Sequence, residues 1–375
     1  MKKTMDIKTE INQSLKRAEQ FLLHRVNTGI PGIKRCSSYH NVEEYPDMCL
    51  PATYNAVHAL VLLGPYQNPD EEIRKNVVDF IQSFQTESGA FRFRNMRDGQ
   101  IWKGKNLAYS WWYIDNHITN YSTGALKSLN AGWKYPLSFV DALKEPEALE
   151  KWLSKRDMAD PWLEGNNIVN LAGFLISELK VQEPERLQEL MEILLGWHDR
   201  LQDKNTGFWG TDHPVNPAGS MEGMAGAAHN FHLYFYSNRE IHYYKPIIDY
   251  CLTFIKGKVK SACLDVDVVD ILANLLVYGY RTEEILEQLE QFAARLIAFQ
   301  NEDGGFADDK SNGVRRMDGW VGGYFEPQGL SNCFATWFRC ATLAMILHCL
   351  DAEAAKRLRF RDSIGIGYFN RDYLR

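Results

Sequence analysis

Three stretches of the chain end in the same way, and this repetition constrains the fold more than any single residue does. Each ending consists of an apolar helical pattern, a glutamine, a short polar loop, a glycine and an aromatic residue. The three endings lie at residues 84–91, 201–209 and 299–306. A pattern that recurs along a chain is typical of repeat architectures, in which each unit packs on its neighbours.

Weaker copies bring the number of such helix endings to six, near residues 25, 85, 154, 202, 256 and 300. Each ending is followed by a second helical pattern that is richer in small residues. These second patterns lie at about 51–63, 119–130, 167–180, 222–236, 266–278 and 332–350. They are apolar on more than one face, which is typical of buried helices, whereas segments such as 283–292 are amphipathic.

The alternation of amphipathic and buried helices predicts an all-α protein, because no sustained period of two indicates strands. We expect an (α/α)6 toroid of six helical hairpins, with an inner and an outer ring of helices. The chain of 375 residues forms one domain in this prediction, with the repeats at about 15–350. The charged segment 352–375 is expected to pack on the outside.

Composition and charge exclude several classes of protein. The net charge is −6 with both signs interspersed, so we expect no nucleic-acid partner. No apolar run has the length of a membrane span and the N-terminus has no signal-peptide pattern, which predicts a cytoplasmic protein. The seven cysteines form no CxxC pair and are interpreted as reduced thiols. We expect no cofactor and no metal ion.

Three long segments precede inner helices, at 31–50, 92–118 and 307–331, and all three fall at one end of the predicted barrel. Long ordered loops in a compact domain are often functional. Their aromatic residues, and one on the last inner helix, are candidate substrate-binding residues that would line or cover a cavity. These candidates are Trp320, Tyr324, Tyr109, Trp112 and Trp337. Aromatic faces stabilise cations and also stack on sugar rings, so they fit two substrate classes.

Three acidic residues, Asp265, Asp267 and Asp270, begin the inner helix near residue 266. Asp267 and Asp270 are three residues apart and share a helix face. Two buried carboxylates at this spacing do not both ionise easily, so one would retain its proton near neutral pH. A retained proton suits a general acid. The alternative is a helix cap followed by buried polar residues that pair with arginine or histidine.

Other polar residues gather on the inner helices. His229 and His232 share one helix face, and either an acid–base role, metal binding with an inner-helix aspartate or a buried core pair fits this spacing. His117 and Glu222 lie near the same end of the barrel and are candidate substrate-binding residues. Arg339, in an apolar helix, requires an anionic partner, which is either Asp267 or Asp270 or a substrate carboxylate or phosphate.

The endings in glutamine, glycine and an aromatic residue resemble the QW repeats of terpenoid cyclases. The six hairpins are similar to the wider α/α-toroid group, which includes squalene–hopene cyclases and protein prenyltransferase β subunits. Asp265 and Asp267 resemble the first two acidic positions of the Asp-x-Asp-Asp element of class II terpene cyclases. Val268 stands at the third acidic position, and Asp270 follows one helical turn after Asp267.

The resemblance implies a cyclase that protonates an isoprenoid with Asp267, assisted by Asp265, Asp270 or His229, while aromatic residues guide the cation. A second hypothesis is a carbohydrate-active hydrolase, lyase or epimerase. In it Asp267 or Glu222 acts as general acid or base, and a histidine binds the glycan or abstracts a proton. A third hypothesis is a non-catalytic binding scaffold, which full salt bridging of the inner acids would favour.

Overall fold

The computed structural model describes residues 6–26, 49–94, 107–156, 158–210, 217–308, 310, 314–316, 325–327 and 329–374. The chain divides into two compact units. Unit 1 comprises residues 1–136, 259–263 and 290–361, and unit 2 comprises residues 137–258, 264–289 and 362–375. The prediction that the whole chain forms one domain stays a prediction.

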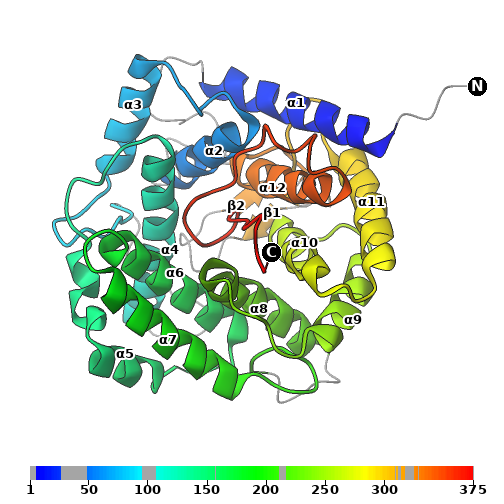
Figure 1. The fold of residues 1–375 in the computed structure, drawn as a ribbon. Coiled ribbons are helices and arrows are strands. Elements are labelled where there is room, and N and C mark those ends of the chain that lie inside the picture. Colours follow the sequence, from blue (N-terminus) through cyan, green and yellow to red (C-terminus); the bar gives the residue numbers. More distant parts are fainter. Residues whose placement is uncertain are drawn as a thin grey trace, which may run out of the picture. The chain divides into compact units, whose positions relative to one another are not determined.

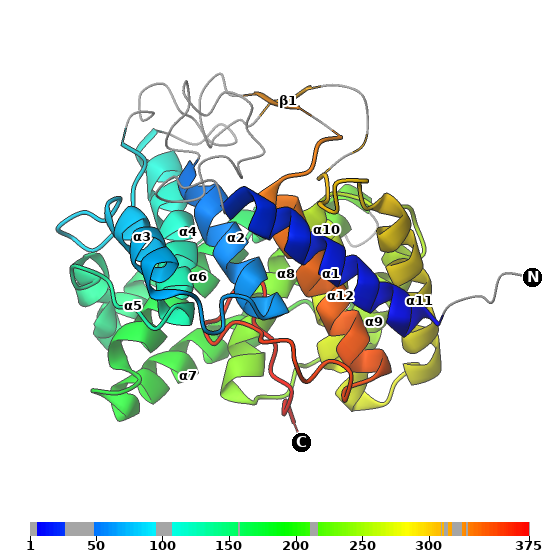
Figure 2. The same ribbon diagram turned by 90° about the horizontal axis from the view of Figure 1, so that it is seen from above.

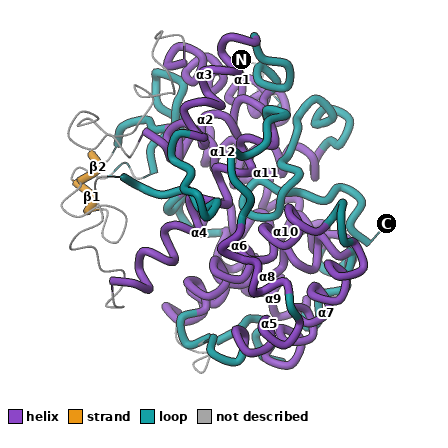
Figure 3. The backbone as a smooth tube through the Cα atoms, turned by 90° about the vertical axis from the view of Figure 1, so that its left-hand side faces the viewer, coloured by secondary structure: helices purple, strands orange, loops and turns teal. Residues whose placement is uncertain are grey.

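Helices make up almost all of the regular structure in the described part of the chain (Figure 1). In chain order they are α1 (Ile7–Val26), α2 (Cys49–Leu63), α3 (Glu71–Gln82), α4 (Leu107–Ser128), η3 (Ser138–Lys144), α5 (Pro146–Leu153), α6 (Pro161–Leu179), α7 (Pro184–Leu201), α8 (Pro217–Ser237), α9 (Tyr244–Ile255), α10 (Ala262–Leu275), η4 (Leu276–Tyr278), α11 (Thr282–Phe299) and α12 (Cys333–Leu350). Two short strands, β1 (Val314–Arg316) and β2 (Phe325–Pro327), pair antiparallel (Figure 3).

Buried and amphipathic helices alternate along the chain, as the sequence predicts. All 15 residues of α2 are buried, whereas α3 buries only Val77 and Ile81 of its 12 residues. The five later inner helices, α4, α6, α8, α10 and α12, lie at or near the predicted second patterns. Each is preceded by an outer helix that ends within three residues of a predicted ending.

In unit 1 the first and last helices of the repeat meet. Helices α1 and α2 both pack on α12 (Figures 1 and 2). At the end of α11, the Gln300 amide donates to the Ser14 carbonyl at 3.0 Å, and its oxygen accepts from the Ser14 hydroxyl at 2.8 Å. This seam and the helix alternation confirm the predicted fold class, an all-α (α/α)6 toroid.

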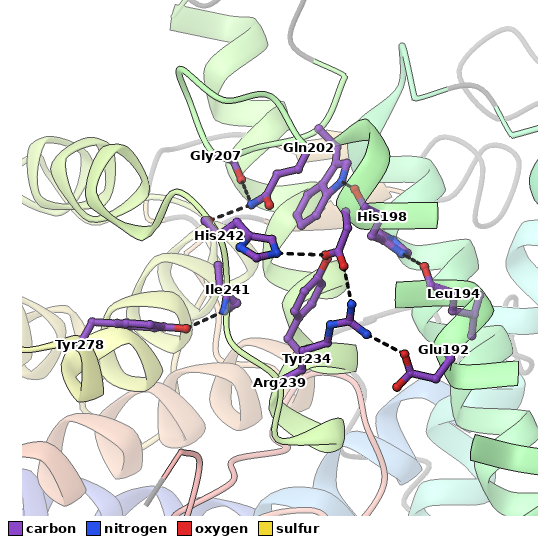
Figure 4. A network of polar contacts seen from close by, with 12 residues as sticks. Glu192, Leu194, His198, Gln202, Gly207, Tyr234, Arg239, Ile241, His242 and Tyr278 are labelled. Carbon is purple, nitrogen blue, oxygen red and sulfur yellow. Dashed lines mark hydrogen bonds and ion pairs between the residues drawn. The ribbon is translucent and has the colours of Figure 1, made fainter. Parts of the chain in front are cut away.

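The glutamines of the recurrent endings tie outer helices to their surroundings. Gln85 donates to the Gly89 carbonyl of its own loop at 2.9 Å and to the Tyr135 carbonyl at 2.8 Å. Gln202 donates to Gly207 at 2.8 Å and to His242, just before α9, at 3.1 Å (Figure 4). A buried amide must find partners, and here each one closes a loop and reaches the next hairpin. The endings are therefore structural.

In unit 2 helices α6 and α8 approach closely through glycine. A Cβ on Gly226 would lie 2.2 Å from the Pro161 carbonyl oxygen, and a Cβ on Gly165 would lie 2.5 Å from the Gly226 oxygen. Real Cβ atoms essentially never show such contacts. The two glycines therefore set the spacing of the helices that carry Glu164 on one side and His229 on the other.

Helix α4 begins 12 residues before the predicted start at residue 119, so the expected long loop at 92–118 is wrong in its second half. Tyr113, Ile114 and Ile118 are buried on this earlier part of the helix. Their spacing is that of one helix face, which closely spaced aromatic and polar residues obscure in the sequence.

Part of the C-terminal segment is buried, although the whole of it was expected on the outside. In unit 2 the Gly365 N–H donates to the ring of His232 on α8, which is a buried inner helix. Ile364 and Ile366 on either side are buried too. The apolar residues among the charges of this segment explain the difference, because their burial favours contact with inner helices.

Among the described helices, α12 alone has the length and apolar composition of a membrane span, although the sequence had indicated none. In the structure 83% of this helix is buried inside the protein, as in the core helix of a folded domain. Burial on all sides and passage through lipid require the same composition, and here the neighbouring helices supply the apolar surroundings.

We expect Gly226→Ala to destabilise the protein by about 1–3 kcal/mol, because the added methyl group forces α6 and α8 apart. Gly196→Ala on outer helix α7 is the matched control, since its Cβ would meet only Arg200 at an ordinary 3.6 Å. The better helix propensity of alanine would stabilise this control by up to about 1 kcal/mol. Urea unfolding measures both, and equal effects of the two substitutions would contradict the close packing.

Candidate active site

Helix α10 carries a cluster of buried acidic residues. Asp267 and Asp270 are 1% and 2% exposed, and the neighbouring Val266, Val268 and Val269 are at most 1% exposed. A helix that is buried on this many faces removes its carboxyl groups from water. Each carboxyl group must then find donors or keep its proton.

Asp270 has found donors for both oxygens. The ring Nε2 of His232 lies 2.5 Å from Oδ2, and the Asn274 amide donates to Oδ1 at 2.8 Å. Asn274 stands one turn further along α10, while His232 reaches over from α8. Both oxygens of Asp270 are therefore held by donors, one from α8 and one from its own helix.

His232 is completely buried, and both of its ring nitrogens are engaged. Nδ1 accepts a hydrogen bond of 2.9 Å from the Gly365 N–H, so Nδ1 carries no proton. The proton of the neutral ring is then on Nε2 and is donated to Asp270. In this arrangement neither ring nitrogen is available to a ligand, and the substrate-binding role of His232 stays a prediction.

Asp267 differs from Asp270 in having no hydrogen-bond partner for either oxygen among the described residues. Burial raises the pKa of Asp267 well above its ordinary value, and the negative charges of Asp270 and Asp265 raise this pKa further. A carboxyl group in these surroundings retains its proton near neutral pH. Asp267 is the protonated member of the acidic cluster.

Asp265 lies in the first turn of α10 and is 1% exposed. The Ala262 N–H, the first of the helix, donates to the Asp308 side chain at 2.7 Å. Since α10 begins at Ala262, Asp265 lies inside the helix and not at the cap position that one interpretation of the sequence gave it. Its charge acts instead on Asp267, two residues further along.

His229 and Glu222 lie on α8 together with His232. His229 stands about one turn before His232 and is 5% exposed, and Glu222 stands about two turns before His229 and is half-buried. Helical spacing puts the three on one face of α8. Among the described residues no group of three or more His, Cys, Asp or Glu side chains is placed to hold a metal ion.

In unit 1 the predicted substrate-binding residues Trp337 and His117 belong to an aromatic cluster. Trp337 is 1% exposed, stacks on His58 at 4.7 Å between ring centroids and meets the edge of Tyr121 at 5.5 Å. His117 meets Tyr121 edge-on at 4.7 Å. Burial and the positive charge of Arg361 lower the pKa of His117 to about 3 and that of His58 well below its usual value. Both rings are therefore neutral.

Arg339 is fully buried in unit 1 and donates to several backbone carbonyls. Its guanidinium donates to the carbonyls of Ala307 at 3.2 Å, Asp308 at 3.1 Å and Lys260 at 3.0 Å, and lies over the ring of Phe299. Guanidinium has five N–H donors, and backbone carbonyls satisfy several of them here.

The remaining candidates are only partly within the described structure. Trp112 on α4 is half-buried. Trp320 and Tyr324 lie outside the described residues, and of Tyr109 the structure describes the helical backbone and not the side chain. Their substrate-binding roles, like those of Trp337, Arg339, His117 and Glu222, stay predictions.

The structure adds two contributors that the sequence analysis missed. Asn274 is four residues after Asp270, and this helical spacing on an apolar helix was a usable signal. Gly365 contributes a backbone N–H from 133 residues beyond His232. The sequence around this glycine contains no signal that would predict such a contact.

Comparisons with known proteins give a distant likeness only. No protein-family profile matches the chain, and no curated protein sequence gives a significant match. Among solved structures, the chain is similar to a polysaccharide lyase, with 13% identity, 93% of this chain and 99% of that chain covered, and a TM-score of 0.46. It is also similar to a family 88 glycosyl hydrolase from Bacteroides vulgatus, with 11% identity, coverage of 90% and 99%, and a TM-score of 0.44.

The predicted class II terpenoid cyclase is wrong. The two solved structures reported above are named as a polysaccharide lyase and a glycosyl hydrolase, and neither name is that of a terpenoid cyclase or a prenyltransferase. The acidic element departs from the cyclase pattern as well. Val268 stands at the third acidic position, and the oxygens of Asp270, one turn after Asp267, are engaged by His232 and Asn274.

The raised pKa of Asp267 links folding to pH. The contribution of Asp267 to the free energy of unfolding is fully present below the pKa of an unfolded aspartate, about 3.9. This contribution falls as the pH rises toward the higher pKa of Asp267 in the folded state. The slope is about 1.4 kcal/mol per pH unit for one proton. We expect Asp267→Asn, which is neutral at every pH, to lose less stability than the wild type on going from about pH 5 to about pH 9.

Urea unfolding across this pH range measures the difference. Asp79→Asn on outer helix α3 is the control, because the Asp79 side chain is 56% exposed. The control should keep the pH dependence of the wild type. Parallel stability curves for the wild type and Asp267→Asn would show that Asp267 is already ionised.

Proposed function

We propose that the protein is a carbohydrate-active enzyme in which Asp267 is the general acid. The observation that carries the proposal is the contrast between Asp267, a buried carboxyl group with no donor among the described residues, and Asp270, a carboxylate with two. Cleavage of a glycosidic bond requires a carboxyl group that still has its proton at neutral pH. Asp267 meets this requirement.

The polarity of the inner helices of unit 2 supports a substrate rich in hydroxyl groups. Helix α6 buries Glu164 and Asn170, and α8 buries His229. Amide, carboxyl and imidazole groups are the kinds of side chain that hydrogen-bond to sugar hydroxyls. The aromatic cluster of Trp337 and His117 belongs to unit 1.

The roles of the carboxyl groups follow from their surroundings. Asp267, which is buried and protonated, donates its proton to the leaving glycosidic oxygen. Glu222 is half-buried and takes the part of the second carboxylate, which activates water or stabilises positive charge at the sugar ring. His229 is the candidate for a hydrogen bond to the glycan or for abstraction of a proton in an elimination or epimerisation.

A binding scaffold without catalysis is the weaker candidate. This candidate would be supported if all the acidic residues of the inner helices were paired, as Asp270 is with His232. Asp267 has no such partner in the part of the chain that the structure describes. A scaffold gains nothing from a buried carboxyl group that destabilises the fold as pH rises.

A panel of polysaccharides and oligosaccharides tests the proposal, with reducing-end release for hydrolysis and NMR for unsaturated or epimerised products. For any glycan that the wild type converts, we expect Asp267→Asn to lower kcat by about 10²–10⁴-fold, because the proton donor is lost. Asp79→Asn on the exposed face of α3 should keep full activity.

Two results would overturn the proposal. One is an Asp267→Asn variant that is folded and as active as the wild type. The other is that the folded wild type converts no glycan by hydrolysis, elimination or epimerisation.

A further inference from the structure

The C-terminal segment 362–375, called the tail below, forms several hydrogen bonds with the end of α8 and the residues that follow it. The Asn370 amide donates to the Phe235 carbonyl at 2.8 Å, and the Leu374 N–H donates to the Asn238 side chain at 2.7 Å. The Tyr373 hydroxyl donates to the Arg239 carbonyl at 2.8 Å. These contacts hold the segment that presents the Gly365 N–H to His232.

A chain of directed hydrogen bonds runs from this tail to α10. The Gly365 N–H donates to Nδ1 of His232, and Nε2 of His232 donates to Oδ2 of Asp270. A backbone N–H can only donate, so Nδ1 of His232 must accept from Gly365. The proton of the ring is then on Nε2, and the bond to Asp270 runs from Nε2 to the carboxyl oxygen. Asn274 fills the second oxygen of Asp270 from the other side.

We propose that this chain makes Asp270 a positioning residue, whose fixed negative charge keeps the proton on Asp267, and that the C-terminal segment is a working part of the site. The catalytic meaning of the inference rests on the proposed function. Asp270 itself touches no substrate in this scheme. It acts through Asp267, which is one helical turn away on the same face of α10.

The charges around the pair are consistent with this assignment. The carboxyl and imidazole groups of α10 are Asp265, Asp267 and Asp270, and those of α8 are Glu222, His229 and His232. The tail adds Asp362 and Tyr368. Burial and the nearby Tyr236 and Asp270 raise the pKa of Tyr368, so its hydroxyl stays neutral. Asp270 and Asp265 are the negative charges that raise the pKa of Asp267.

Titration of the Asp267 carboxyl group tests the inference without any substrate. Carboxyl ¹³C NMR of the labelled full-length protein follows it, and the signal that disappears in Asp267→Asn identifies it. We expect Asp270→Asn to move this titration to lower pH by about one unit or more, because a buried like charge is removed. His232→Phe, which removes the donor to Oδ2, should move it in the same direction.

Two further variants separate positioning from mere packing. His232→Gln retains an N–H donor at the position of Nε2 and should titrate nearly as the wild type does. Asn274→Leu removes the donor to Oδ1 and should give a smaller shift in the same direction as Asp270→Asn. It keeps the test possible if His232→Phe does not fold, which circular dichroism shows.

An Asp267 titration that is unchanged in folded Asp270→Asn and Asn274→Leu would overturn the inference. This result is distinguishable from failure of the proposed function. If the titration shifts and no glycan is converted, the positioning role stands and the proposed function fails. If conversion of a glycan depends on Asp267 and the titration does not shift, the general acid stands and Asp270 has another role.

Discussion

Burial of the inner helices on nearly every face is the constraint on which the rest of the structure depends. Once α2 or α10 has lost its water, each polar group on it requires a partner or a neutral state. Hydroxyl groups solve the problem within their own helix, as Thr53 does by donating to the Cys49 carbonyl at 2.7 Å. The charged groups Arg339 and Asp270 also take partners from other segments, so they help to determine which segments come together.

Two solutions for charged groups appear on inner helices. Arg339 uses backbone carbonyls and the ring of Phe299, and thereby fastens the segments around residues 260 and 307 to α12. Asp270 uses a histidine from α8 and an asparagine from its own helix. Asp267 has neither kind of partner among the described residues, and its neutrality is the chemical consequence. A carboxyl group with a raised pKa thus arises where the packing satisfies one carboxyl group and not its neighbour.

Features that depend on local spacing were predictable from the sequence. The outer-helix endings at Gln85, Gln202 and Gln300 were recognisable because a repeat places the same residues at the same turn. The acidic residues of α10 were recognisable as a cluster, since three carboxyl groups on one apolar helix are unusual. The earlier start of α4 was not, because aromatic residues at successive positions obscure the period of 3.6 residues.

Contacts between distant segments were beyond prediction for a physical reason. Asp267 and Asp270 are chemically identical side chains on one helix face, and their order in the sequence does not say which one keeps a proton. The sequence establishes the all-helical repeat, the buried helices and the presence of an acidic cluster. The tertiary structure makes the two aspartates different. His232 from α8, itself held by the Gly365 N–H, contacts Asp270, whereas burial raises the pKa of Asp267.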